Sequence, residues 1–279
     1  MAGFFSKGDK QNQWIAKAEQ AYEKGLFEDA AELFSKAAEA EPSNANLWIK
    51  LAASQKYTGK YDAAVRSYKK AAEANPDAGE AWIQLALLLG DSGKCEEALS
   101  ALSHVVIPES ELYLRERKCE WLERTGKYAD AAALSAAHPT SKAYRTRSAD
   151  LLLRAGRYAE AREIYDDLSR SFEGGAEYAA SAGLCSELMG DAKGALFRYK
   201  NADEEDLLSR YRRARLEEAA GEFKEAAASY AKVQQGTDGD DISVSARRAF
   251  ALFFAGNGQE AASQLAQIIS RANSSAELW

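Results

Sequence analysis

Four arginines share one repeated position in this sequence. Eight glycines recur at spacings of 30 to 35 residues, and the residue nine places before the glycine is an arginine in four of the eight cases, namely Arg117, Arg147, Arg212 and Arg247. Arginine makes up only 18 of the 279 residues, and Lys50 adds a fifth cation at this position. Guanidinium groups bind carboxylates and phosphates through planar, bidentate contacts. The pattern therefore predicts a row of anion-binding donors, mostly in the second half of the chain.

A second interpretation of these arginines is internal pairing. Glu116, Glu120 and Asp150 lie within a few residues of Arg117 or Arg147, so on a helix they could neutralise those side chains. The sequence leaves both interpretations open.

Other chemistry finds little support. The two histidines, His104 and His138, have no nucleophile or carboxylate at a spacing typical of a hydrolase, and they do not combine with Cys95, Cys119 or Cys185 at the i, i+3 or i+4 spacing of a helical metal site. No glycine-rich phosphate-binding motif occurs. We therefore expect no catalysis, no metal and no cofactor, and three reduced, partly buried thiols.

Composition narrows the class of protein. The net charge is −7, which argues against a general nucleic-acid binder. The first residues, MAGFFSKGDKQNQ, turn polar too soon for a signal peptide, and no apolar run approaches the ~18 residues of a membrane helix. The sequence predicts a soluble, cytoplasmic protein that contacts neither nucleic acid nor membrane.

The glycines mark a repeat of two helices. We call them the turn glycines: Gly25, Gly59, Gly93, Gly126, Gly156, Gly190, Gly221 and Gly256. Alanine stands five residues after every one, a small residue or cysteine stands seven before, and an aromatic residue stands nine after in five repeats. After Gly59, apolar residues follow at i, i+3, i+4 and i+7 from Tyr61, which lays one stripe along a helix. Large and small residues at fixed places indicate interlocking helices.

These residues resemble a known family. The set in the second repeat is similar to the tetratricopeptide repeat, a 34-residue helix-turn-helix unit: Trp48, Leu51, Ala52, Gly59, Tyr61, Ala64, Tyr68, Ala71 and Pro76. The fourth, sixth and eighth repeats match less well. The resemblance implies an all-α, right-handed superhelical solenoid whose first helices line a concave groove for a protein or peptide.

The predicted boundaries follow from the repeat. Residues 1–10 form an N-terminal extension, residues 11–275 form the solenoid, and its units start near residues 11, 45, 79, 112, 142, 176, 207 and 242. Residues 276–279 then begin a truncated ninth repeat, because Trp279 stands where Trp14, Trp48 and Trp82 stand in theirs. We expect the chain to be a fragment of a longer protein. The exposed apolar surface at its C-terminal end would then stack on another copy of the chain. The alternative is a natural terminus whose tail folds over the eighth repeat.

The function implied by the resemblance is a non-catalytic scaffold that binds a protein or peptide in its groove, and the arginines favour an acidic partner. Two alternatives remain: a substrate-recruiting arm of a longer enzyme, and a structural protein that self-associates through its C-terminal repeat. The family's clamp for chaperone tails is missing, because its positions hold Ile15, Glu19, Lys50, Glu80 and Gln84. The predicted partner-binding residues of the groove are therefore Lys50 and the four arginines.

Overall fold

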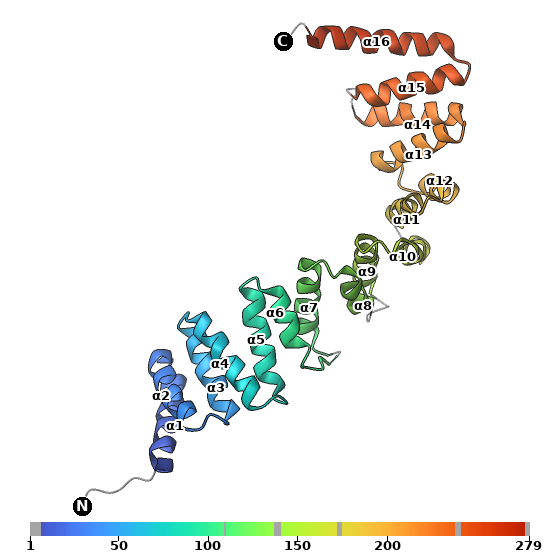
Figure 1. Ribbon diagram of the computed structural model, residues 1–279. Helices are drawn as coiled ribbons and strands as arrows, with labels where there is room; N and C mark the ends of the chain where they lie inside the picture. Colours follow the sequence, from blue (N-terminus) through green and yellow to red (C-terminus); the bar gives the residue numbers. More distant parts are fainter. Residues whose placement is uncertain (1–6, 109, 137–140, 172–174, 238–240, 277–279) are drawn as a thin grey trace, which may run out of the picture. The chain divides into compact units, whose positions relative to one another are not determined.

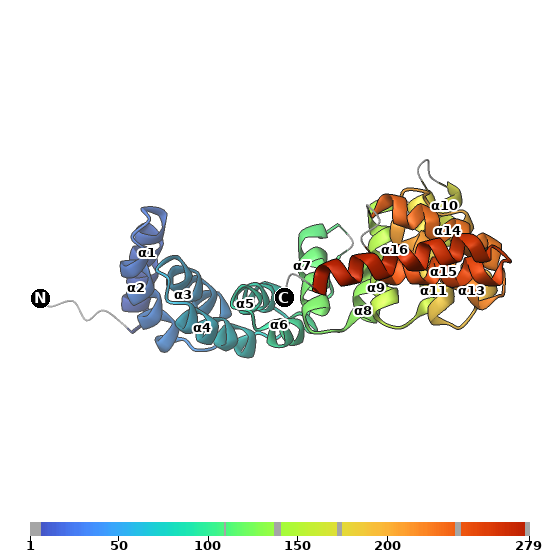
Figure 2. The same cartoon turned by 90° about the horizontal axis from the view of Figure 1, so that it is seen from above.

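The computed structural model describes residues 7–108, 110–136, 141–171, 175–237 and 241–276. These residues form sixteen α-helices and no strand. Figure 1 and Figure 2 show the helices following one another in chain order, and within each of two compact units they pack on their chain neighbours. The chain is an all-α repeat solenoid, as predicted.

The first unit comprises residues 1–134. Its helices are α1 (Lys7–Glu23), α2 (Phe27–Ala40), α3 (Ala45–Tyr57), α4 (Tyr61–Ala74), α5 (Gly79–Asp91), α6 (Cys95–Leu102), α7 (Leu112–Arg124) and most of α8 (Tyr128–Ala136). Helix α1 begins four residues before the predicted first repeat at residue 11, so the end of the expected N-terminal extension is helical.

The second unit comprises residues 135–279. Its helices are α9 (Lys142–Arg154), α10 (Tyr158–Ser171), α11 (Ala176–Leu188), α12 (Ala192–Lys200), α13 (Leu207–Ala219), α14 (Phe223–Gly236), α15 (Ile242–Phe254) and α16 (Gly258–Ala276). Trp279, on which the expected ninth repeat depends, lies outside the described residues.

The turn glycines end the first helix of each repeat. Gly59 has a φ of 73°, in the left-handed region that side chains with a Cβ rarely adopt. The Lys60 N–H then donates to the Gln55 carbonyl at 2.9 Å, and the Gly59 N–H donates to the Lys56 carbonyl at 3.1 Å. These bonds satisfy carbonyls that the helix end would leave unpaired. All eight turn glycines have a φ between 73° and 87°.

The small residues lie where paired helices touch. The alanine five residues after the turn glycine is at most 3% exposed in every repeat, from Ala30 to Ala261. Seven residues before Gly190, Gly183 has no room for a side chain, since an added Cβ would lie 2.7 Å from the Tyr199 ring. The residue nine after the glycine is large in every repeat except the fourth, which has Ser135. In seven repeats it is at most 4% exposed.

Candidate partner-binding surface

The predicted binding residues lie on the first helices of their repeats: Lys50 on α3, Arg117 on α7, Arg147 on α9, Arg212 on α13 and Arg247 on α15. Ion pairs join these side chains to carboxylates on the first helix of the preceding repeat. Lys50 pairs with Glu19, Arg117 with Asp91, Arg212 with Glu187 and Arg247 with Glu218. The shared position therefore connects successive first helices.

The last two ion pairs include a tyrosine. Arg212 Nη1 lies 3.0 Å from Glu187 Oε2, and the Tyr199 hydroxyl donates to the same oxygen at 3.0 Å. One repeat later, Arg247 Nη1 lies 3.2 Å from Glu218 Oε1, and the Tyr230 hydroxyl donates to Glu218 Oε2 at 2.6 Å. The arrangement recurs because the spacing of all three residues from the turn glycines is the same.

The two tyrosines act as hydrogen-bond donors at neutral pH. Burial raises the pKa of the Tyr199 hydroxyl above its ordinary value, and the charge of Glu187 raises it further. Burial also raises the pKa of Tyr230, as does its hydrogen bond to Glu218. Because both phenols stay protonated, each carboxylate has a buried donor on one side and an arginine on the other.

Arg117 has a second carboxylate partner. Besides Asp91, Arg117 pairs with Glu120 at 2.6 Å, one of the internal partners that the sequence suggested. Asp150, the residue suggested for Arg147, accepts a hydrogen bond from the Tyr165 hydroxyl. Arg147 itself is half-buried on α9.

The bridging arginines remain partly exposed and use few of their donors on the described carboxylates. A guanidinium carries five N–H groups, and the hydrogen bonds of Arg212 and Arg247 described above use only Nη1. The Arg212 side chain is 31% exposed and the Arg247 side chain is 41% exposed. Both can therefore offer further donors to a ligand while they bridge the repeats.

Sequence reasoning missed Arg215. It lies three residues after Arg212 on α13, so it projects from a neighbouring part of the same helix face. Its side chain is exposed and makes no ion pair or hydrogen bond to any described residue. The repeated position did not include it, because it stands six residues before the turn glycine rather than nine.

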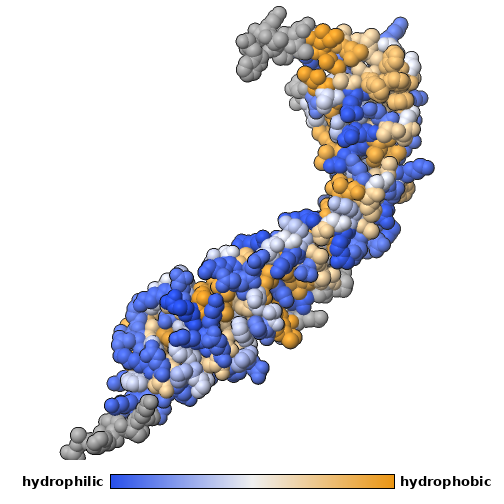
Figure 3. All heavy atoms as spheres, in the orientation of Figure 1, coloured by the Kyte–Doolittle hydropathy of each residue, from blue (hydrophilic) through white to orange (hydrophobic). Residues whose placement is uncertain are grey.

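A phenylalanine cluster adjoins this basic row. Phe250 and Phe254 follow Arg247 on α15 by three and seven residues, so they share its face, and they are 47% and 53% exposed. Phe223 on α14 stacks on Phe254 with ring centroids 5.1 Å apart, and Phe250 lies 4.6 Å from Phe254. Phe253, 65% exposed, contacts Phe254. In Figure 3, hydrophobic residues gather over the C-terminal helices.

We define the α11–α15 surface by five residues: Arg212, Arg215, Arg247, Phe250 and Phe254. The ion pairs from α13 to α11 and from α15 to α13 show that these first helices lie side by side. The surface thus combines guanidinium donors with exposed aromatic rings. Such a combination suits a segment with both carboxylates and large apolar side chains.

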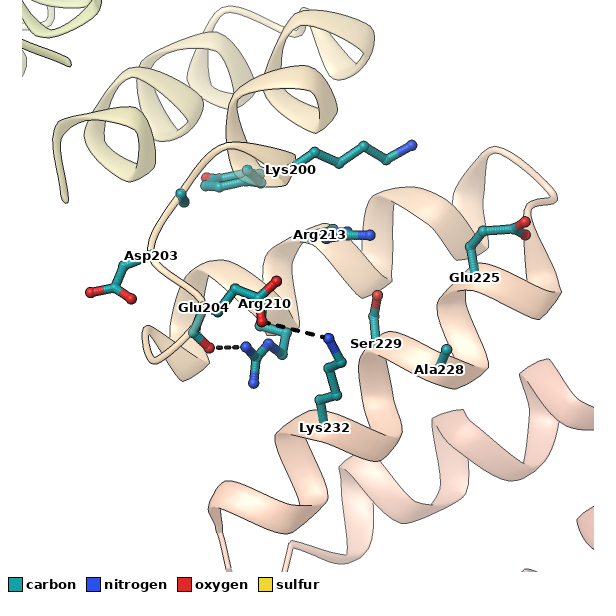
Figure 4. A pocket seen from close by; sticks show the side chains of 11 residues that line it. Lys200, Asp203, Glu204, Arg210, Arg213, Glu225, Ala228, Ser229 and Lys232 are labelled. Carbon is teal, nitrogen blue, oxygen red and sulfur yellow. Dashed lines mark hydrogen bonds and ion pairs between the residues drawn. The ribbon is translucent and has the colours of Figure 1, made fainter. Parts of the chain in front are cut away.

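A pocket beside α13 is a weaker candidate. It has a volume of about 180 Å³ and lies where the loop between α12 and α13 meets α14 (Figure 4). Two of its cations have partners within the chain: Lys232 lies 3.8 Å from Glu204, and Arg210 donates to the Glu204 carbonyl. Beneath it, the fully buried Glu217 accepts from Arg213 and Ser229, each at 2.7 Å. Lys232, Arg210 and Arg213 therefore have structural roles within the chain.

Metal sites and membrane-spanning helices are two other features that the described residues were compared with. Among the described residues, no group of three or more histidine, cysteine or acidic side chains could hold a metal ion. In the same part of the chain, no helix is long and apolar enough to cross a membrane. Cys95, Cys119 and Cys185 are free thiols and buried, and burial raises the pKa of Cys185 to about 11.

Comparisons with known proteins agree with the repeat pattern. Tetratricopeptide repeat models match residues 46–88, 122–176 and 146–203. No curated protein is significantly similar in sequence. Among solved structures, a chain from Naa15/Naa10 bound to HypK-THB is 17% identical with a TM-score of 0.71, over 95% of this chain and 42% of that chain. This chain therefore spans less than half the length of that one.

Two further solved structures are more distant. A tetratricopeptide repeat protein from Parabacteroides merdae is 18% identical with a TM-score of 0.44, over 87% of this chain and 99% of that chain. The TPR2AB-domain:pHSP90-complex of yeast Sti1 is 14% identical with a TM-score of 0.46, over 91% of this chain and 99% of that chain. With the repeat models, the eight turn glycines and the paired helices, the conclusion is that the chain belongs to the tetratricopeptide repeat family.

Proposed function

We propose that this protein is a non-catalytic scaffold that binds a protein or peptide on its first helices, with the α11–α15 surface as the main contact. The family and fold support the general role of an interaction scaffold. The single observation that carries the specific site is the position of exposed Phe250 and Phe254 on the same helix face as Arg247.

The chemistry of the surface defines the partner. Arg215 and the unused donors of Arg212 and Arg247 favour carboxylates, while the phenylalanine rings favour large apolar side chains. The partner is therefore an acidic segment with at least one aromatic or aliphatic anchor. We extend the proposal to Arg147 and, in the first unit, to Lys50 and Arg117, which occupy the same repeated position.

A second candidate function is self-association through the last repeat. The exposed apolar side chains of α16, Leu265 at 48% and Ile269 at 59%, favour it. Leu265 and Ile269 lie on the second helix of their repeat, whereas the residues of the α11–α15 surface lie on first helices. Self-association and peptide binding can therefore be tested separately.

A selection experiment tests the first proposal. A displayed library of random 12-residue peptides is selected against the full chain, and the recovered peptides are assayed against a variant carrying Arg212→Gln, Arg215→Gln and Arg247→Gln. We expect enrichment of Asp and Glu together with Phe, Leu or Trp, and loss of binding to a variant that keeps its helical circular dichroism spectrum.

The matched control is Lys224→Gln. Lys224 is an exposed cation on α14, outside the α11–α15 surface. Its replacement should therefore leave peptide binding unchanged. Peptides without acidic residues, or equal binding to the triple variant, would show that this surface does not recognise the partner.

A further inference from the structure

The last repeat exposes a position that every other repeat buries. Nine residues after the turn glycine stand Phe34, Tyr68, Leu102, Ser135, Tyr165, Tyr199 and Tyr230, all at most 4% exposed. The same position in the last repeat is Leu265, which is 48% exposed. In the fifth repeat, for example, the Tyr165 ring stacks on Tyr178 of the following helix, with ring centroids 6.5 Å apart. At Leu265 no described helix covers it.

Leu265 belongs to an uncharged face of α16. By the helical period, Ala262, Ala266 and Ile269 lie on the same side of the helix, and all three are exposed. The charged residues of the described part of α16, Glu260 and Arg271, lie on the opposite side. Glu260 pairs there with Arg248 of α15 at 2.8 Å. We call Ala262, Leu265, Ala266 and Ile269 the end face.

The contact between repeats also changes at this end. In the sixth and seventh repeats, the residue three before the turn glycine is a glutamate, Glu187 or Glu218. Each glutamate forms an ion pair with the arginine of the next repeat. In the last repeat that residue is Phe253, which is 65% exposed. A molecule that packs here therefore meets an aromatic ring in place of a carboxylate.

One face of α1, by contrast, is polar. Twelve residues before the turn glycine, six of the seven later repeats hold a buried residue, such as Leu47, Ala81 or Val244. The first repeat has exposed Gln13 at this position, and exposed Lys17 and Gln20 lie on the same side of α1. A terminal repeat with such a polar outer face is capped. The side of α1 that holds Gln13, Lys17 and Gln20 is therefore polar, whereas the end face of α16 is apolar.

We propose that the end face docks onto the end face of a second copy, so that two chains associate tail to tail about a two-fold axis. A polar face with Gln13 and Lys17 does not complement Leu265 and Ile269, which disfavours head-to-tail stacking. An uncharged, aliphatic face with two alanines does complement itself, and a two-fold axis brings identical patches together. This inference specifies the self-association candidate and is independent of peptide binding on the α11–α15 surface.

The test is the mass of the full chain by sedimentation equilibrium between 1 and 200 µM. We expect a monomer–dimer equilibrium that ends at the dimer, because closed two-fold contacts do not propagate. The double variant Leu265→Glu and Ile269→Lys should raise the dissociation constant at least tenfold with an unchanged helical spectrum. The matched control is Gln267→Lys, an exposed change on another side of α16 that should leave the dimer intact.

Crosslinking then distinguishes the two stacking modes. Ala266→Cys should form a covalent dimer on oxidation, whereas Gln20→Cys on α1 should not, and the three native thiols are buried. A chain that stays monomeric at 200 µM would overturn the proposal, as would larger species that grow with concentration or a dimer unaffected by the double variant. None of these outcomes affects the peptide selection, whose variants lie on other helices.

Discussion

Arg247 on α15 donates to both carboxylate oxygens of Glu218 on α13, at 3.2 and 3.4 Å. The Tyr230 hydroxyl on α14 completes the contact from the other side at 2.6 Å. One carboxylate therefore ties together three helices from two repeats. In a repeat protein, stability depends on such contacts between neighbours, so this arrangement bears on stability as well as on binding.

Tyr230→Phe should lower the free energy of unfolding by about 1 kcal/mol, the usual value of one hydrogen bond, because Glu218 loses its buried donor. Tyr68→Phe is the control. Tyr68 is equally buried, but its hydroxyl donates to no described residue, so the change should cost less than ~0.5 kcal/mol. Urea unfolding followed by circular dichroism measures both. Equal losses would mean that the Glu218 contact adds no stability.

Gly90→Ala should destabilise the first unit by about 1–3 kcal/mol through overpacking. An added Cβ would lie 2.1 Å from the ring of Trp121, which is fully buried. Gly79→Ala on the same helix meets Val105 at 3.6 Å, an ordinary contact, and should be neutral or slightly stabilising. Thermal unfolding of the two variants compares them directly. A stable Gly90→Ala protein would contradict the packing described for Trp121.

Asp241 should make stability depend on pH at the start of α15. The Ser243 hydroxyl and the N–H groups of Ser243 and Val244 donate to its carboxylate, and these hydrogen bonds lower its pKa below the ordinary 3.8. Because the folded-state pKa is the lower one, the stabilisation is complete above the unfolded-state pKa and is lost as the pH falls through the folded-state pKa.

Replacing Asp241 with Ala should therefore cost about 1 kcal/mol at pH 7, as for other helix caps, and less as the pH falls toward 3. Unfolding by urea at several pH values measures the difference. A cost that stays constant down to pH 3 would show that the charged carboxylate is not the source of the stabilisation.

The repeat and its helices could be predicted from the sequence because the positions are local. Gly59 must adopt a positive φ, and Ala64 must lie where two helices touch, so residue type alone reports both. The arginine row was also visible, as a composition bias at one position. Its pairing with Glu187 and Glu218 was not, because those contacts join different repeats at spacings of 25 and 29 residues.

Exposure was the harder property to predict. Phe250, Leu252, Phe253 and Phe254 look alike as a run of large apolar residues, yet Leu252 is buried and the three phenylalanines are exposed. A helix turns by about 100° per residue, so neighbours in such a run face the core or the solvent according to the exact register of packing. Arg215 was missed for a related reason, since an exposed, unpaired cation has no signature in the repeat.

The most direct measurement is the affinity of one selected acidic peptide for Arg247→Gln and for Glu218→Gln, by fluorescence anisotropy at low salt. If Arg247 contacts the peptide, Arg247→Gln should weaken binding by roughly tenfold, or ~1.4 kcal/mol. Glu218→Gln should strengthen it, because the internal carboxylate no longer competes for the guanidinium. Binding unchanged in both variants, or weakened equally in both, would contradict the proposal that the α11–α15 surface recognises an acidic partner.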